Sequence, residues 1–208
     1  MSDVVKNVYK LAEALGIPGG FYFNLIKQDD WSSIIKLHAL LEAAITYLIV
    51  EATNNKKLED IFSRLELSNL KTGKLAFARK YDLLDKQTIS FIRTISEIRN
   101  ECVHKIGNIG LKLDKYVSSL NKDKRNNFYS AMLVGTPDQI DINGQSISVK
   151  EFVSENPKQH IWYVSMYLLE HIYLSQQTAA KEHSYAEFAR NIVEESGNVA
   201  NAKVQIET

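Results

Sequence analysis

Residues 86–105 read KQTISFIRTISEIRNECVHK, and the spacing of their apolar side chains decides how the chain folds. On a helical wheel with about 100° per residue, these side chains gather in an arc about 120° wide. Such an arc predicts an amphipathic helix that buries one face in a core and leaves the other face exposed. The arc has Phe91, Ile95, Ile98 and Cys102 at its centre and Ile92 and Val103 at its edges.

The rest of the chain also reads mainly with the helical period, and only three prolines interrupt it. Asp29 or Asp30 is suited to cap the longest of the other helices, because a short carboxylate accepts hydrogen bonds from free N–H groups. Residues 197–208 are expected to form a frayed tail. The predicted helices span residues 4–15, 31–52, 57–67, 72–81, 86–105, 113–133, 158–182 and 185–195.

One segment departs from the helical pattern. Residues 140–149 alternate apolar and polar side chains around Asn143-Gly144, a dipeptide typical of tight hairpin turns. Two strands this short are marginal alone, so they are expected to lie on the helical body. Ser148 is placed to cap a short helical turn after the second strand. We therefore expect a single all-α domain over residues 1–208, with a small β-hairpin insertion near residues 139–149.

The composition of the chain limits the classes of protein to which it can belong. The chain has 208 residues, of which 45% are hydrophobic, and this is typical of a soluble globular protein. The single cysteine, Cys102, excludes an internal disulfide framework and a cysteine-based zinc site, and it suits a reducing cytoplasm. The longest apolar run, residues 39–50, contains Glu42 and Thr46, so no membrane span or membrane partner is expected.

The formal net charge is zero, but the charge is unevenly distributed. Residues 1–55 carry four basic and six acidic side chains, and residues 127–208 carry five basic and ten acidic ones. Residues 56–126 carry 16 basic and nine acidic side chains, a net charge of +7. A basic middle between acidic ends keeps a nucleic-acid partner possible, although lysines on solvated helix faces explain the same count equally well.

Three polar residues near the end of the 86–105 helix are candidates for a site. With Phe91 at 0°, Arg99 lies at about 80°, Asn100 at about 180° and His104 at about 220° on the wheel. Asn100 and His104 therefore face away from the core, whereas Arg99 lies inside the apolar arc. A guanidinium there must reach solvent, contact a second chain or pair with a carboxylate, for which Glu42, Glu97 and Glu101 are the candidates.

The run Arg99-Asn100-Glu-Cys-Val-His104 resembles the signature of the HEPN superfamily, which has Arg, a polar residue that is often Asn, and then His a few positions on. LHALLEAAITYLIVEA at residues 37–52 resembles the first long core helix of that family. Residues 74–105 resemble the region that follows in its mannitol-operon-repressor-like branches. The resemblance covers about 70 residues, a third of the chain. It implies a HEPN-like helical bundle with a core over about residues 31–134, followed by the hairpin and C-terminal helices over residues 135–196.

The resemblance also implies a function. Catalytic members form homodimers whose adjacent motif helices make a composite, metal-independent endoribonuclease site that uses no cofactor. His104 would be the general acid/base, Arg99 would bind the scissile phosphate, and Asn100 would orient either the phosphate or the histidine; these residue types suit that chemistry. The setting implied is a toxin with an antitoxin or regulatory partner, or a phage-defence effector. The basic residues that could hold the RNA backbone near the motif are Lys71, Lys74, Arg79, Lys80 and Arg93.

Non-catalytic alternatives remain open. The chain would then be a HEPN-like dimerising regulatory or interaction module, as many family members are. Glu97 and Glu101 place negative charge beside His104, which would raise its pKa and repel phosphate. His104 would then only complement the helix dipole. His38 and Glu42, four residues apart, are expected to form a hydrogen-bonded pair. The aromatic residues Trp162, Tyr163, Tyr167 and Tyr173 are expected to pack in the core or a dimer contact, with base stacking as the alternative.

Overall fold

The computed structural model describes residues 1–104, 106–142 and 145–206, and within these ranges it contains ten α-helices, two short 3₁₀ helices and one two-stranded sheet. The all-α class and the small hairpin are therefore confirmed. The elements that contribute most to the core or the candidate site are α1 (Asp3–Ala14), α3 (Asp30–Thr53), α5 (Lys74–Lys80), α6 (Lys86–His104), α7 (Leu113–Ser119), α8 (Lys122–Ala131) and α10 (Pro157–Ile206). The shorter ones are α2 (Phe21–Leu25), η1 (Lys56–Leu58), α4 (Glu59–Arg64), η2 (Ile106–Gly110), β1 (Gln139–Ile142), β2 (Gln145–Ser148) and α9 (Val149–Glu155).

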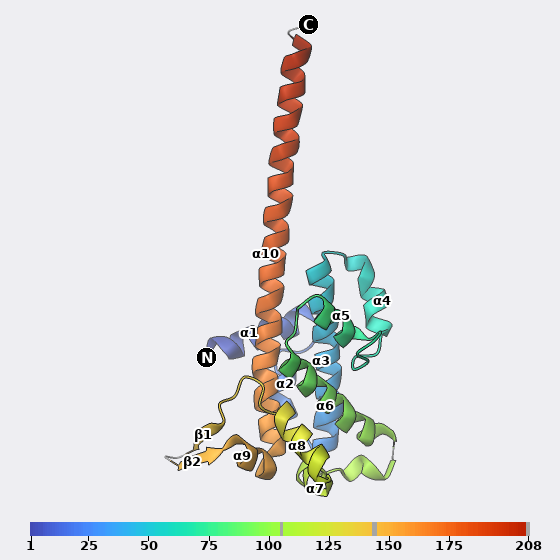
Figure 1. Ribbon diagram of the computed structural model, residues 1–208, viewed down its shortest axis with the longest axis vertical. Helices are drawn as coiled ribbons and strands as arrows, with labels where there is room; N and C mark the ends of the chain where they lie inside the picture. The colour runs from blue at the N-terminus through green and yellow to red at the C-terminus, as the bar shows by residue number, and fades with distance from the viewer. Residues whose placement is uncertain (105, 143–144, 207–208) are drawn as a thin grey trace.

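Helix α3 is the centre of the body, with other helices packed around it (Figure 1). Asp29 caps its start, because the Asp29 carboxylate accepts a hydrogen bond from the Ser32 N–H at 2.8 Å. Asn54 ends it in the left-handed conformation, at φ 48°. Eleven of its residues are buried, and they are Ser33, Ile34, Leu37, Leu40, Leu41, Ala44, Ile45, Thr46, Leu48, Ile49 and Val50.

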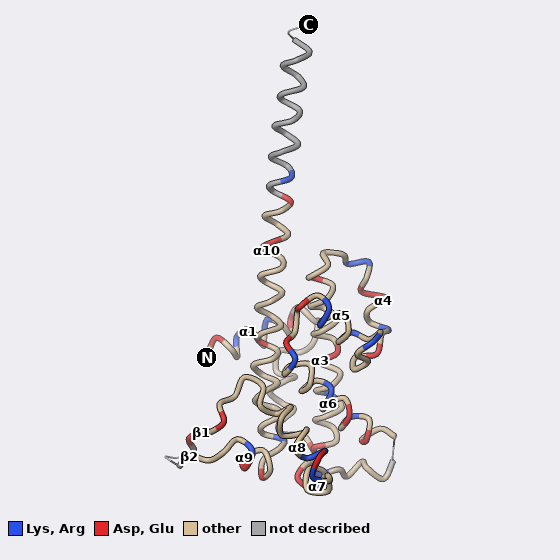
Figure 2. The backbone as a smooth tube through the Cα atoms, in the orientation of Figure 1, with Lys and Arg blue, Asp and Glu red and all other residues tan. Residues whose placement is uncertain are grey.

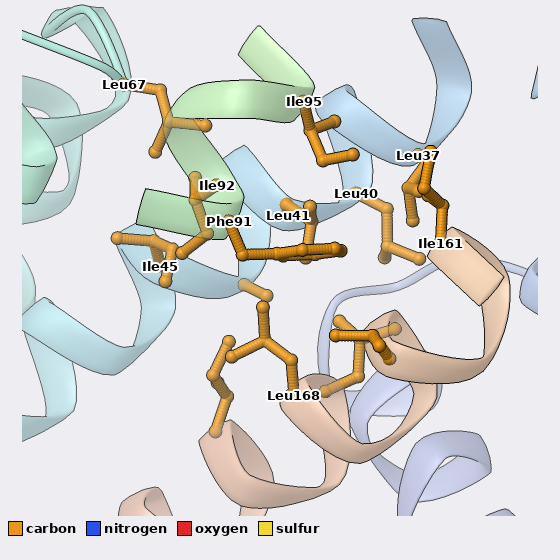
Figure 3. Packing of buried hydrophobic residues seen from close by; sticks show 14 of the residues in the cluster. Leu37, Leu40, Leu41, Ile45, Leu67, Phe91, Ile92, Ile95, Ile161 and Leu168 are labelled. Carbon is orange, nitrogen blue, oxygen red and sulfur yellow. The ribbon is translucent and has the colours of Figure 1, made fainter. Parts of the chain in front are cut away.

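Helices α6 and α10 cover α3 with their apolar faces. Figure 3 shows Phe91 and Ile92 of α6 meeting Leu41 of α3, with Leu168 of α10 on the same cluster. Phe91, Ile92, Ile95, Ile98 and Cys102 are all buried, so the centre of the predicted stripe is confirmed. Helix α1 packs along α10 on the outside of this layer.

Length and composition alone would allow α3 to cross a membrane. In its most apolar window, however, 67% of the residues are buried inside the protein. The apolar character that would allow α3 to cross a membrane is thus the same character that a central core helix requires, since most of its apolar window is covered by the rest of the protein.

Asp30 ties three helices together at the first turn of α3. Its Oδ2 accepts a hydrogen bond from the backbone N–H of Leu113 at 2.9 Å, at the start of α7. Its Oδ1 lies 3.4 Å from the ammonium of Lys158 in α10, and that ammonium also donates to the carbonyl of Gln28. The hydrogen bond between Leu113 and Asp30 sets where α7 begins beside α6.

The hairpin lies at one end of the body, next to α9 (Figure 1). Its strands are antiparallel, with Ile140 opposite Ile147 and Gln139 opposite Ser148. Asn143 and Gly144, the predicted turn, lie outside the described residues. Ser148 caps α9 by accepting from the Glu151 N–H at 3.1 Å, as the sequence indicated.

Four helix predictions need correction. The predicted 113–133 helix is two helices, α7 and α8, because Leu120 is extended and Asn121 caps a new start by accepting from the Lys124 N–H. The predicted 57–67 helix is shortened to α4 behind η1, and α2 was not predicted. The predicted helices 158–182 and 185–195 are one helix, because no proline or glycine separates them. That helix also continues through residues 197–206, where a frayed tail was expected.

Helix α10 belongs to the body over its first half only. Ile161, Val164, Leu168, Leu169 and Ile172 are buried there and belong to the hydrophobic core. Gln176 is its last buried residue among those described, and the helix then extends away from the other elements (Figure 1).

The aromatic residues of α10 divide into two groups. Trp162 stacks on Tyr22 with ring centroids 5.4 Å apart, and Tyr173 also packs against the core, as expected. Tyr163 and Tyr167 are instead exposed, and their hydroxyls lie 2.9 Å apart.

The central position of α3 can be tested by truncating a leucine. Leu41→Ala should lower the free energy of unfolding by about 2–5 kcal/mol, because the fully buried side chain leaves a cavity between α3 and α6. Leu174→Ala, at a half-exposed leucine of α10, is the matched control and should cost less than about 1 kcal/mol. Urea denaturation followed by circular dichroism measures both, and equal losses would contradict the arrangement.

Candidate functional site

The last turn of α6 is held by two side chains from other elements. Trp31 of α3 donates its indole N–H to the carbonyl of Cys102 at 3.0 Å. Asn108 of η2 donates its side-chain amide to the carbonyl of Glu101 at 2.7 Å. Both bonds satisfy carbonyl groups that a helix end leaves without an intrahelical partner. The end of α6 therefore has a defined position relative to α3.

His104 is the final residue of α6, and its side chain is exposed. Val103 beside it is also exposed, which corrects its predicted place at the edge of the buried stripe. Ile109, in η2, is a second exposed apolar side chain close along the chain.

Arg99 and Asn100 are in direct contact. The Arg99 Nη1 donates to the Asn100 Oδ1 at 3.1 Å, and both side chains are half-buried. Arg99 also lies near His38 of α3. Burial is the main reason why the pKa of His38 is below its ordinary value; Glu42 raises that pKa, and the charges of Arg99 and Lys74 lower it further. Arg99 therefore lies close enough to α3 to act on His38 and is hydrogen-bonded to Asn100.

A polar cleft of about 1180 Å³ lies between α6, η2, α7 and α8, and Asn100 lines it. Three lysines, Lys112, Lys115 and Lys124, line the same cleft. Figure 2 shows basic and acidic residues interleaved over α7 and α8. The cleft is therefore a mixed surface in which lysines contribute the positive charge expected of a phosphate-binding site.

Two acids of α6 line the cleft beside Asn100. Glu97 and Glu101 both act on Tyr116, whose pKa rises to about 12, first because the phenol is buried and then because of the two carboxylates. Glu97 is also 3.8 Å from Arg93, one turn before it. The two acids thus line the cleft together with Asn100, whereas the sequence placed them beside His104, which is not among the residues that line the cleft.

The lysines of α7 and α8 were missed at the sequence level. Lys112 is the N-cap residue of α7 and Lys115 lies in its first turn, so both are at the start of that helix. Their position within the basic segment was visible, but nothing local indicated that α7 folds back beside α6. The signal that existed was the +7 charge of residues 56–126.

The predicted basic set does not gather around His104. Arg79 and Lys80 end α5 and are exposed, as is Lys71 before it, and the Arg79 guanidinium donates to the Leu70 carbonyl at 3.3 Å. They precede the first turn of α6, whereas His104 lies in its last turn. Since α6 has 19 residues, these two turns are about 27 Å apart along the helix axis.

Lys74 was predicted to bind the RNA backbone, but the structure buries it. Only 1% of its side chain is exposed, and its ammonium donates to the Glu42 carboxylate at 2.8 Å and to the Ser63 carbonyl at 3.4 Å. A buried ammonium needs such partners. Lys74 is therefore a structural residue that joins α5 to α3. Glu42 is therefore hydrogen-bonded to Lys74, whereas the sequence predicted a hydrogen bond between Glu42 and His38.

Cys102 lies in the same helix but faces the core. Burial raises the pKa of its thiol to about 11, with a further contribution from Glu101. A thiol with that pKa carries very little thiolate near neutral pH, so Cys102 does not supply a nucleophile there. Over the described residues, no group of three or more His, Cys, Asp or Glu side chains is arranged to hold a metal ion.

No protein-family model matches the chain, and comparisons with curated proteins and with solved structures found no similar protein. The HEPN-like assignment therefore stays a prediction from the motif.

The Lys74–Glu42 pair can be tested by breaking it from either side. Glu42→Gln should lower the free energy of unfolding by about 3 kcal/mol, because it leaves a buried ammonium without its carboxylate. Lys74→Met should cost about 1 kcal/mol or less, because it removes the buried charge and keeps the volume. Urea denaturation measures both. Glu59→Gln, at an exposed glutamate of α4, is the control and should have little effect. A larger loss of stability for Lys74→Met than for Glu42→Gln would contradict the structural role of Lys74.

Proposed function

We propose that the chain binds RNA at the end of α6 and cleaves it without a metal, through a site that two copies complete. The observation that carries the proposal is the exposed His104 in the last turn of a helix whose preceding turn holds the Arg99–Asn100 contact at 3.1 Å. The lysine-lined cleft beside Asn100 supports it, because lysines attract the RNA backbone.

The residue types suit a transphosphorylation. A neutral imidazole takes the proton from the ribose 2′-hydroxyl, whose oxygen attacks the adjacent phosphorus. The bond to the 5′ oxygen breaks, and that oxygen receives a proton from a histidine that is protonated. The products are a 2′,3′-cyclic phosphate and a 5′-hydroxyl. Arg99 would stabilise the charge that develops on the phosphate oxygens, and Asn100 would orient Arg99.

A second copy of the chain would bring together an arginine and a histidine that point in different directions within one copy. Arg99 and His104 lie about 140° apart on the α6 wheel, so they do not point at one spot within a chain. Two α6 ends placed side by side would set the Arg99 of each copy near the His104 of the other. Val103 and Ile109 are exposed apolar side chains next to that end, and a dimer contact would remove them from water.

The second candidate is a non-catalytic dimerising module that binds RNA or a regulatory protein. Glu97 and Glu101 on the cleft face of α6 favour it, because carboxylates beside Asn100 oppose the approach of a phosphate. In that case the Arg99–Asn100 contact would only pair two polar side chains within α6. A toxin or phage-defence role belongs to the first candidate, with an antitoxin as the partner that would cover the same end of α6.

Cleavage is tested by incubating single-stranded RNA with the purified protein and a chelator. The wild type should release fragments ending in 2′,3′-cyclic phosphate. His104→Ala should lower the rate by about 10²–10⁴-fold, because the acid/base group is lost. Arg99→Ala should lower it by about 10²–10³-fold, because charge stabilisation is lost. Gel separation and end-group analysis of the fragments measure these rates.

His171→Ala is the matched control, because His171 is an exposed histidine on α10 away from the α6 end, and it should leave the rate unchanged. Equal cleavage by all variants would show a contaminating nuclease and overturn the proposal. Absence of cleavage by the wild type, with RNA binding that Lys115→Glu weakens, would favour the non-catalytic module.

The dimer contact has its own test. Ile109→Asp should convert the dimer to a monomer and abolish cleavage, because a carboxylate would be buried in the proposed contact. Ile61→Asp, on α4, is the matched control, since Ile61 is 57% exposed and Ile109 is 56% exposed. Light scattering after size-exclusion chromatography measures the mass. A monomeric wild type, or equal effects of both substitutions, would contradict the contact.

A further inference from the structure

A second hollow, separate from the α6 cleft, lies between the hairpin and the start of α10. It has a volume of about 810 Å³ and shares no lining residue with the cleft beside α6. Trp162, Tyr163 and Tyr167 of α10 form one wall, and Phe152 of α9 contributes a further aromatic ring. Ile140 of β1 closes the side toward the hairpin. This size and aromatic lining are typical of small-molecule sites.

His160 gives the cavity a polar group with a defined role. It is buried, and its Nε2 lies 2.7 Å from the carbonyl oxygen of Met132. A carbonyl only accepts, so Nε2 carries the hydrogen and Nδ1 is left as an acceptor. Burial lowers the pKa of His160, which keeps the imidazole neutral near pH 7. The ring also packs edge-on against Phe152, at 6.1 Å between centroids.

Thr136 adds an unsatisfied hydroxyl to the wall opposite α10. Its Oγ1 is shielded from water and has no hydrogen-bond partner among the described residues, although Thr136 lines the cavity. Buried hydroxyls normally have a partner. Rotation about χ1 exchanges the hydroxyl with the methyl group, and this would turn the oxygen toward a bound molecule.

The charges around the cavity exclude several classes of ligand. Of the side chains that line it, Asp141 alone carries a formal charge near neutral pH, and Asp141 already interacts within the chain. An anion such as a nucleotide phosphate would find no basic partner. A cationic ligand would have to compete with the interaction that Asp141 already makes within the chain. The walls are instead suited to an uncharged molecule.

We propose that this cavity binds a small, planar, uncharged aromatic or heteroaromatic molecule that donates a hydrogen bond, with Tyr163 and Tyr167 against its ring and His160 as the acceptor. Aromatic side chains favour a flat ring by stacking or edge contacts. An acceptor inside an apolar wall selects ligands with an O–H or N–H group, because a ligand without one leaves that acceptor unpaired. This binding site is independent of the proposed RNA chemistry.

The proposal is tested with three probes that share one bicyclic ring. 2-Naphthol is uncharged and donates a hydrogen bond, 2-methoxynaphthalene lacks the donor, and 2-naphthoate is an anion. Isothermal titration calorimetry of the full chain should show saturable binding of 2-naphthol and at least about fivefold weaker binding of the other two. Equal affinity for 2-naphthoate would overturn the charge argument, and equal affinity for 2-methoxynaphthalene would overturn the role of the acceptor.

Variants of exposed residues place the probe in the cavity. Tyr163→Ala with Tyr167→Ala should weaken binding of 2-naphthol about tenfold, and both residues are exposed enough, at 45% and 44%, to leave the core intact. Tyr185→Ala, on the same helix at 73% exposure and outside the cavity, should have no effect. Absence of saturable binding, or equal binding by the double variant and the wild type, would overturn the proposal.

Discussion

The extensive burial of α3 is the constraint on which the rest of the structure depends. Eleven of its 24 residues are buried, and its exposed residues, Lys36, Ala39 and Ala43, form one narrow stripe, so other helices must pack around the remaining sides. Helix α6 and the first half of α10 supply the largest apolar faces. Asp30, at the polar end of α3, then joins α7 and α10 to the same point through its two carboxylate oxygens.

The orientation of α6 follows directly from that constraint. Because Phe91, Ile95 and Ile98 must face α3, the remaining directions of the helix are determined. Asn100 faces the cleft of α7 and α8, and His104 lies at the exposed rim. Arg99 is left at the border of the buried arc, where it contacts Asn100. The motif is therefore spread around the helix, and this spread is the physical reason for proposing that a second copy completes the site.

The two hollows differ in the ligands that their side chains can accept. The cleft beside α6 combines three lysines with two acids, which suits a charged and hydrated polymer. The cavity beside α10 has aromatic walls and a neutral histidine, which suits a small uncharged ring. The difference arises from the side chains of each wall: α7 and α8 present charged side chains to the cleft, whereas the start of α10 presents aromatic side chains to the cavity.

Local information in the sequence determined the helical class, the Asp29 cap, the Asn143-Gly144 hairpin and the buried stripe of α6, because periodicity and capping act over a few residues. It also marked Arg99, Asn100 and His104 as candidates. Only the tertiary structure decided that Lys74 is buried against Glu42, 32 residues away, and that the lysines of α7 and α8 lie beside Asn100. The aromatic cavity likewise required β1 and α10 to meet. Contacts between segments far apart in the chain depend on how α3 is covered, and no local pattern records which helix covers which side.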